Sequence, residues 1–256
     1  MEFWGLTDCG HVRVQNQDSY VVKRFVEADG TELLAAVVCD GMGGAKAGNV
    51  ASGMAVERFV DTLAAGLTAH EEAAALMRAA ARDANRAIYE KAASGPDFDG
   101  MGTTMVAVVA RKDRATVANV GDSRCYLVGS GGIRQLTKDH SLVEDMVDRG
   151  EIDRAEAWLH PRRNFITRAL GTEADVECDI FQTPLEPGDA LLLCSDGLSG
   201  VVNPQELLFE VVYGGERSTA VRRMVDIALE RGAPDNVTAV LLSNGAPPEQ
   251  ADKTAT

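Results

Sequence analysis

Apolar and polar positions divide the first part of the chain into strand-length runs followed by helix-length periodic segments. Short apolar runs that predict strands cover residues 3–7, 19–26 and 32–40. A turn is expected at 27–32, between the last two runs. From residue 45 to Leu67, and again over 73–88, apolar residues follow the spacing of one helix face. The stretch SGPDFDG at 94–100 ends the second of these predicted helices.

The rest of the chain repeats the order of strands followed by a helix pair. Further strands are expected over residues 102–110, 114–120, 123–129, 132–137, 176–183, 190–196 and 236–243. A polar, partly helical segment spans 140–171, and two amphipathic helices are expected around 207–211 and 221–228. Because strands and helices cluster instead of alternating, the pattern favours an α+β fold with mostly antiparallel strands and helix pairs covering the sheet faces.

Five aspartates adjoin the predicted strands. Asp40 and Asp196 each end an apolar run and are followed by glycine, Asp18 opens a strand, Asp235 precedes one, and Asp122 lies between two. A single aspartate at a strand end is ordinarily a turn residue. Five of them can converge if the strands belong to one sandwich, and clustered carboxylates then raise each other's pKa unless cations neutralise them. Oxygen ligands without His or Cys suit Mg²⁺ or Mn²⁺ rather than Zn²⁺.

This set of carboxylates points to hydrolysis of a phosphoester. Two ions about 3.5–4 Å apart can bridge one water and acidify it, so that the resulting hydroxide attacks phosphorus in line. Asp40 is the natural bridge between the ions, because the exposed carbonyl of Gly41 beside it is a further oxygen ligand. Such a mechanism requires no nucleophile from the protein.

Seven motifs, in order over residues 12–242, resemble those of the metal-dependent PP2C-type (PPM) serine/threonine phosphatases of bacterial type. They are VRVQNQDSY, VVCDGMGG, GTTMVAVV, ANVGDSRCYL, LTKDHS, LLLCSDGL and APDNVTAVLL. The resemblance implies a β-sandwich of two antiparallel sheets flanked by helix pairs, in four αββα layers. It also implies a single domain over 1–244 with a substrate-selecting flap at about 142–165, and a disordered tail follows at 245–256.

The resemblance assigns ligands to two Mn²⁺ or Mg²⁺ ions. Asp40, Asp196 and Asp235 would bind the first ion. Asp40 and the Gly41 carbonyl would hold the second, together with Asp18 acting through water. These residues would carry catalysis through the bridging hydroxide.

Other site residues follow from the same motifs. Asp122 would join Asp196 in holding a third, weaker ion. Arg13 would grip the substrate phosphate, because a guanidinium is always charged and can bond two phosphate oxygens at once. Asn236 would line the site near Asp235.

The proton donor for the leaving group is open at this point. Animal relatives carry His after the first Asp-Gly, where this chain has Met42. A metal-bound water, His140 or His160 are the alternatives, and each histidine has a competing interpretation as a flap or surface residue.

Rival chemistries fit the sequence poorly. A cysteine nucleophile needs Arg six residues further on, which none of the five cysteines has. The DFDG at 97–100 mimics an aspartyl-phosphate motif but follows no buried strand, and GGAKAGNV lacks the Lys and Ser/Thr of a P-loop. A pseudophosphatase that only binds a partner would be expected to have lost a metal carboxylate, and all five are present.

The net charge and the positions of the cysteines limit which partners and which cellular location are expected. The formal net charge of −14 argues against nucleic acid and anionic membranes as partners. No apolar run is long enough for membrane insertion and no signal peptide is evident, while scattered cysteines without C-x-x-C indicate a reducing, cytoplasmic location. We expect a monomer. The resemblance implies phosphorylated proteins as partners, including a bacterial Ser/Thr kinase that the enzyme opposes, with dephosphorylation of an anti-sigma antagonist as the alternative role.

Overall fold

Two antiparallel β-sheets pack face to face in the computed structural model, which describes residues 1–26, 30–44, 47–68 and 72–245. The strands of the first sheet, in spatial order, are β1 (Glu2–Asp8), β11 (Val237–Ser243), β10 (Ala190–Cys194), β7 (Arg124–Gly129) and β8 (Gly132–Gln135). Those of the second are β2 (Asp18–Val26), β3 (Glu32–Met42), β5 (Met105–Ala110), β6 (Arg114–Val120) and β9 (Asp179–Pro184), with β4 (Gly102–Thr103) beside β3. Each neighbouring pair among these strands is antiparallel, as the strand clustering predicts.

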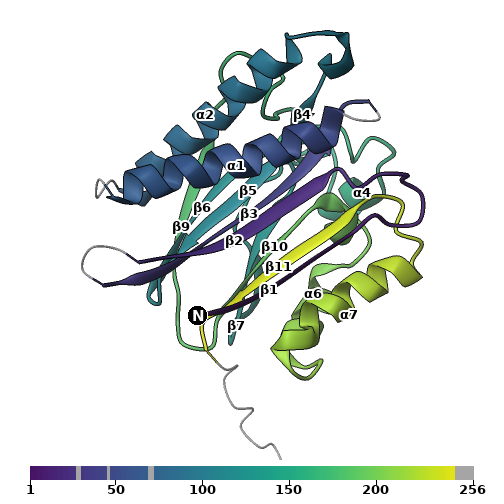
Figure 1. Cartoon of the computed structure of the whole chain (residues 1–256). Helices are drawn as coiled ribbons and strands as arrows, with labels where there is room; N and C mark the ends of the chain where they lie inside the picture. The colour runs from purple at the N-terminus through teal and green to yellow at the C-terminus, as the bar shows by residue number, and fades with distance from the viewer. Residues whose placement is uncertain (27–29, 45–46, 69–71, 246–256) are drawn as a thin grey trace, which may run out of the picture.

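A pair of helices covers the outer face of each sheet (Figure 1). Helices α1 (Ala47–Thr68) and α2 (Ala73–Ala92) lie on the second sheet, whereas α6 (Pro204–Val212) and α7 (Arg217–Glu230) lie on the first. The predicted α+β sandwich flanked by helix pairs is therefore confirmed.

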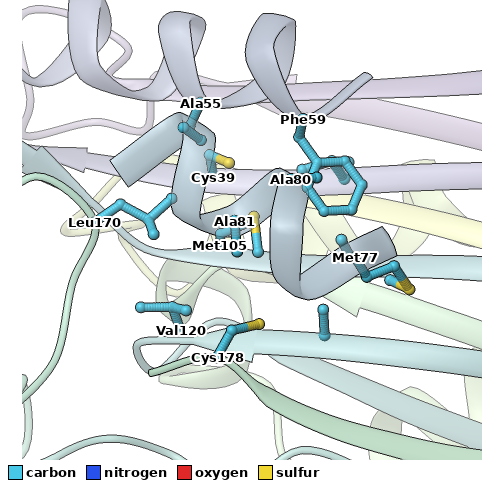
Figure 2. Packing of buried hydrophobic residues seen from close by; sticks show 14 of the residues in the cluster. Cys39, Ala55, Phe59, Met77, Ala80, Ala81, Met105, Val120, Leu170 and Cys178 are labelled. Atoms are coloured by element: carbon cyan, nitrogen blue, oxygen red, sulfur yellow. The ribbon is translucent and has the colours of Figure 1, made fainter. Parts of the chain in front are cut away.

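Apolar residues form three buried layers, one between the sheets and one under each helix pair. The packing of β3 explains why its sequence is apolar throughout. Leu33, Val37 and Cys39 belong to the layer under α1 and α2, whereas Leu34 and Val38 belong to the layer between the sheets. Both faces of the strand are buried, so the period-two alternation of a half-exposed strand is absent. Figure 2 shows Cys39 in the helix-covered layer with Phe59, Met77 and Met105.

Strand β3 does not end at Asp40, as the apolar run suggests, but continues to Met42. The extension pairs with β4, so that Gly41 lies opposite Thr103. A side chain at Gly41 would meet the backbone oxygen of Gly48 at 2.0 Å. Glycine is therefore required here because the backbone of α1 approaches β3 too closely for a Cβ.

Short helices occupy the polar segment between the strand clusters. Within the predicted flap lie α3 (Leu142–Asp148) and α4 (Arg154–Leu159). Two more short helices lie elsewhere: α5 (Asp196–Ser199) follows β10, and the 3₁₀ helix η1 (Pro96–Phe98) follows α2. The predicted turn at 27–32 lies partly outside the described residues, and the tail lies outside them beyond Gly245. None of the helices in the described part of the chain is both long and apolar enough to cross a membrane.

Candidate active site

The β2–β3 pairing places two of the predicted carboxylates opposite each other. Asp18 and Asp40 are register partners in this antiparallel ladder. The backbone of Asp40 is fixed further by Thr104, because its N–H donates to Thr104 Oγ1 at 2.9 Å and its carbonyl accepts from the Thr104 N–H at 2.9 Å. Thr103 Oγ1 donates to the same carbonyl at 2.8 Å. The Asp40 side chain is thus carried on a backbone held from both sides.

The remaining carboxylates come from chain segments at the same end of the sandwich. Asp196 is the first residue of α5, Asp235 lies two residues before β11, and Asp122 lies in the turn from β6 to β7. These three residues and Asp40 line one cleft of about 910 Å³. Strand ends from both sheets therefore bring together four of the five aspartates that the sequence singled out.

Gly41, Met42 and Arg13 also line the cleft, as predicted, whereas Asp18 lies beneath its surface. Asp18 Oδ2 accepts hydrogen bonds from Ser195 Oγ at 2.8 Å and Thr238 Oγ1 at 2.6 Å. Its second oxygen, Oδ1, is buried and has no hydrogen-bond partner.

Burial and mutual repulsion shift the titration of these groups. The pKa of Asp18 is raised to about 7: burial is the largest cause, the two hydroxyl donors oppose it, and the charges of Asp196 and Asp235 add to it. Burial followed by the charges of Asp18 and Asp196 raises the pKa of Asp40 well above its usual range. The pKa of Asp122 rises well above its usual range through burial and then the charge of Asp196. These carboxylates are close enough to oppose one another's ionisation.

The donor set suits hard divalent cations. It consists of carboxylate and backbone oxygens, and two buried atoms, Asp18 Oδ1 and Asp196 Oδ1, lack any hydrogen-bond partner. Groups of three His, Cys, Asp or Glu side chains that already converge on one point are absent from the described residues. Asp40, Asp196 and Asp235 are gathered in one cleft, where Asp235 pairs with Arg13.

Asn236, next to Asp235, is not among the residues that line the cleft, and its side chain anchors the loop that carries Arg13. Its side chain is buried. Asn236 Oδ1 accepts from the Gln17 N–H at 2.8 Å, and Nδ2 donates to the carbonyls of Cys9 at 2.9 Å and Gln15 at 3.2 Å. A single amide therefore fixes three points along residues 9–17.

Neither of the two histidines considered as proton donors lines the cleft. His140 is buried below it, and its Nδ1 accepts from the Gly121 N–H at 3.0 Å while Nε2 lies 3.2 Å from Asp179 Oδ2. His160 ends α4, and its Nδ1 accepts from the Arg162 N–H at 3.2 Å. Met42 does lie in the cleft, but its side chain carries no proton to donate.

Sequence reasoning missed Ser195 and Thr238, which orient Asp18. The Thr238 N–H donates to Ser195 Oγ at 3.0 Å, so the Ser195 hydroxyl is free to donate its own hydrogen to Asp18. Ser195 precedes Asp196 directly, and Thr238 lies in the last strand, so both are inside motifs that the sequence singled out. Their polar side chains amid apolar runs were the available signal.

Comparison with known proteins agrees with this geometry. A family model described as "Protein phosphatase 2C" matches residues 8–241. The chain is 42% identical over 241 residues to the serine/threonine phosphatase stp of Listeria welshimeri, with 92% of this chain and 93% of that protein covered. The crystal structure of the serine/threonine phosphatase Stp1 from Staphylococcus aureus superposes with a TM-score of 0.83 at 36% identity, covering 94% of each chain.

A second solved structure, the catalytic domain of the phosphatase PstP in complex with two manganese ions, has a TM-score of 0.77 at 36% identity. That comparison covers 94% of this chain and 96% of the other. The family model covers every cleft carboxylate described above and all the strands except most of β1 and the end of β11. The chain therefore belongs to the protein phosphatase 2C family of serine/threonine phosphatases.

Proposed function

We propose that this chain hydrolyses phosphoserine and phosphothreonine on proteins at a centre of two Mn²⁺ or Mg²⁺ ions. Asp40, Asp196 and Asp235 would hold one ion, and Asp40, the Gly41 carbonyl and, through water, Asp18 would hold the other. The observation that carries this proposal is the convergence of these carboxylates at one end of the sandwich, with buried oxygens that lack any partner. The two manganese ions in the related PstP structure support the same composition.

The bound ions would supply activation of the attacking water and neutralisation of charge at phosphorus. This chain's residues would hold the ions and the substrate. Asp18 and Asp40 are fixed on neighbouring strands, and the Arg13 guanidinium can bind two phosphate oxygens in its fork. Cys39 and Cys194 are fully buried, and burial raises the pKa of both thiols, which argues against a cysteine nucleophile.

Asp122 is the candidate ligand for a third, weaker ion. It lines the same cleft as Asp196, and the charge of Asp196 raises the pKa of Asp122. The physiological setting we propose is a cytoplasmic monomer whose phosphoprotein substrates are products of a Ser/Thr kinase. The relatives named as serine/threonine phosphatases support the substrate class.

The test is hydrolysis of a phosphothreonine peptide by protein stripped of metal and then supplied with Mn²⁺ or Mg²⁺. Activity should appear only with added ions, stop with EDTA, and be lost in Asp40→Asn and Asp196→Asn. Asp97→Asn is the matched control, because Asp97 is exposed and belongs to the DFDG motif that mimics an aspartyl-phosphate site. Full turnover by the metal-stripped protein would contradict the two-ion centre, and no turnover under any metal would favour the pseudophosphatase.

A further inference from the structure

A second cavity of about 390 Å³ opens beside the metal cleft, between the flap helices α3 and α4 and the segment from α5 to the start of α6. The two cavities share five lining residues, which are Arg13, Asp122, Asn164, Asp196 and Asp235. The second cavity is therefore continuous with the place where the substrate phosphate would bind. A polypeptide whose phosphorylated residue occupies the cleft can therefore reach this cavity.

The charged groups deep in this cavity already have partners. Asp139 is 8% exposed and accepts from Arg124 Nη2 at 2.6 Å, from Arg124 Nε at 3.0 Å and from Gln135 Nε2 at 2.9 Å. On the flap side Glu144 pairs with Arg154 through both guanidinium ends, with Nη2 2.9 Å from Oε1. A charged ligand entering beside these two pairs would lose water without gaining a free counter-charge from them.

Part of the wall is apolar, formed by Val143, Ala157, Trp158, Val201, Pro204 and Pro234. These residues belong to α3, to α4 and to the chain around α5 and β11, so the flap supplies one side and the sandwich the other. Arg163 Nη1 donates to the Trp158 carbonyl at 2.9 Å, which ties the end of α4 to the chain that leads back toward the cleft.

We propose that this cavity, called here the flanking pocket, binds a bulky apolar side chain of the phosphoprotein substrate, aromatic or branched aliphatic. The inference rests on the proposed function of the neighbouring cleft. Successive Cα atoms are about 3.8 Å apart, so the shared rim of the two cavities places the recognised side chain within two residues of the phosphorylated one. An apolar occupant is favoured because Val143, Trp158, Val201 and two prolines supply apolar wall, while Asp139 and Glu144 are already paired with arginines.

Phosphothreonine peptides with alanine on both sides provide the test. Phe, Lys or Glu is placed singly at each position within two residues of the phosphothreonine, and kcat/KM is measured with Mn²⁺. Phe at one position should raise kcat/KM about tenfold over the all-alanine peptide, since burial of a large apolar side chain contributes enough for that factor. Lys and Glu should give no such gain.

Two variants locate the preference in the flanking pocket. Ala157→Leu fills part of it, so the ratio of kcat/KM for the Phe peptide to that for the alanine peptide should fall toward one. Trp158→Ala removes a wall and should lower the same ratio. Ala155→Leu is the control, because Ala155 is on the same helix, is exposed and does not line the pocket. That variant should keep the wild-type ratio.

The possible results separate this inference from the function beneath it. Hydrolysis of all peptides at similar rates, a preference for Lys or Glu, or an unchanged ratio in both Ala157→Leu and Trp158→Ala would overturn the flanking pocket and leave the phosphatase function standing. Failure to hydrolyse any phosphopeptide, with Mn²⁺ present and the fold verified by circular dichroism, would overturn the proposed function and this inference with it.

Discussion

Arg13 Nη2 lies 2.7 Å from Asp235 Oδ2, so the arginine expected to bind substrate phosphate is paired with a carboxylate expected to bind a metal ion. The Asp235 hydrogen bond and charge raise the pKa of Arg13, which keeps the guanidinium charged. An ion on Asp235 would compete with the guanidinium for Asp235 Oδ2. Metal binding would therefore release Arg13 toward the cleft, where a phosphate could take the place of the carboxylate.

Replacement of Arg13 tests this competition. Arg13→Ala should bind Mn²⁺ more tightly, by roughly threefold, since the pair is half exposed and such pairs contribute up to about 1 kcal/mol. The same variant should raise KM for a phosphopeptide, because the forked phosphate contact is lost. Titration calorimetry measures the first effect and steady-state kinetics the second.

Arg86→Ala is the matched control, since Arg86 forms a comparable exposed pair with Asp83 on α2. It should change neither quantity. Weaker Mn²⁺ binding in Arg13→Ala would show that Arg13 supports the ion site instead of competing with the ion.

Asp40→Asn should stabilise the metal-free protein. Burial and the neighbouring charges of Asp18 and Asp196 oppose ionisation of Asp40, and a neutral amide of the same shape removes that opposition. In EDTA the melting temperature should rise by about 2–4 °C, which corresponds to about 1 kcal/mol for a chain of this size. The stabilisation of wild type by Mn²⁺ should disappear in the variant, whereas Asp97→Asn should behave as wild type. An Mn²⁺-induced shift of normal size in Asp40→Asn would remove Asp40 from the ligand set.

The fold was largely readable from the chain because its signals are local. Clustered apolar runs and helix-face spacings lie within single elements, and each predicted strand has a counterpart in the sandwich. The ends of elements were harder, because tertiary contacts decide them. β3 continues past Asp40 since β4 lies alongside to pair with Gly41 and Met42, and nothing near residue 40 in the sequence announces that partner.

In the candidate site, too, only the residues whose signal lies within one segment could be predicted. Asp40 and Asp196 stand out because a carboxylate at the end of a buried run is visible in one segment. The support of Asp18 was not visible, since Ser195 and Thr238 lie 177 and 220 residues away from it along the chain. The contacts of Asn236 were not visible either, because sequence proximity to Asp235 does not reveal that its side chain donates to the loop backbone.

Loss of either hydroxyl beside Asp18 should weaken metal binding. Ser195→Ala and Thr238→Val each leave Asp18 Oδ2 with one hydrogen bond where it has two. Because such supporting contacts orient ligating groups, the Kd for Mn²⁺ should rise about tenfold or more, while kcat at saturating Mn²⁺ falls less. Thr116→Val, a buried threonine of β6, controls for loss of a buried hydroxyl elsewhere. Equal Mn²⁺ affinity in all three variants would leave Asp18 without a part in ion binding.

His140 should make stability depend on pH on the acid side of neutrality. Its side chain is buried, and burial lowers its pKa; the Asp179 contact opposes this shift and the charge of Arg168 adds to it. In the folded chain Nδ1 accepts from the Gly121 N–H, an interaction that a protonated ring cannot make. In the unfolded chain the ring titrates near its ordinary pKa of about 6.5.

The direction of the stability change with pH follows from the titration of His140 in the folded and the unfolded chain. Above about pH 6.5 the ring is neutral in both, and the contribution of His140 to stability is complete. As the pH falls below that value the unfolded chain takes up a proton that the folded chain does not, so the contribution is lost progressively toward the lowered folded pKa. His140→Asn keeps an acceptor for Gly121 but cannot titrate. The difference in unfolding free energy between wild type and His140→Asn, measured by urea denaturation in EDTA, should therefore be constant from pH 7 to 8 and shift against wild type below about pH 6.5. His160→Asn, at the end of α4, should follow wild type throughout, and parallel profiles for wild type and His140→Asn would show that His140 does not carry this linkage.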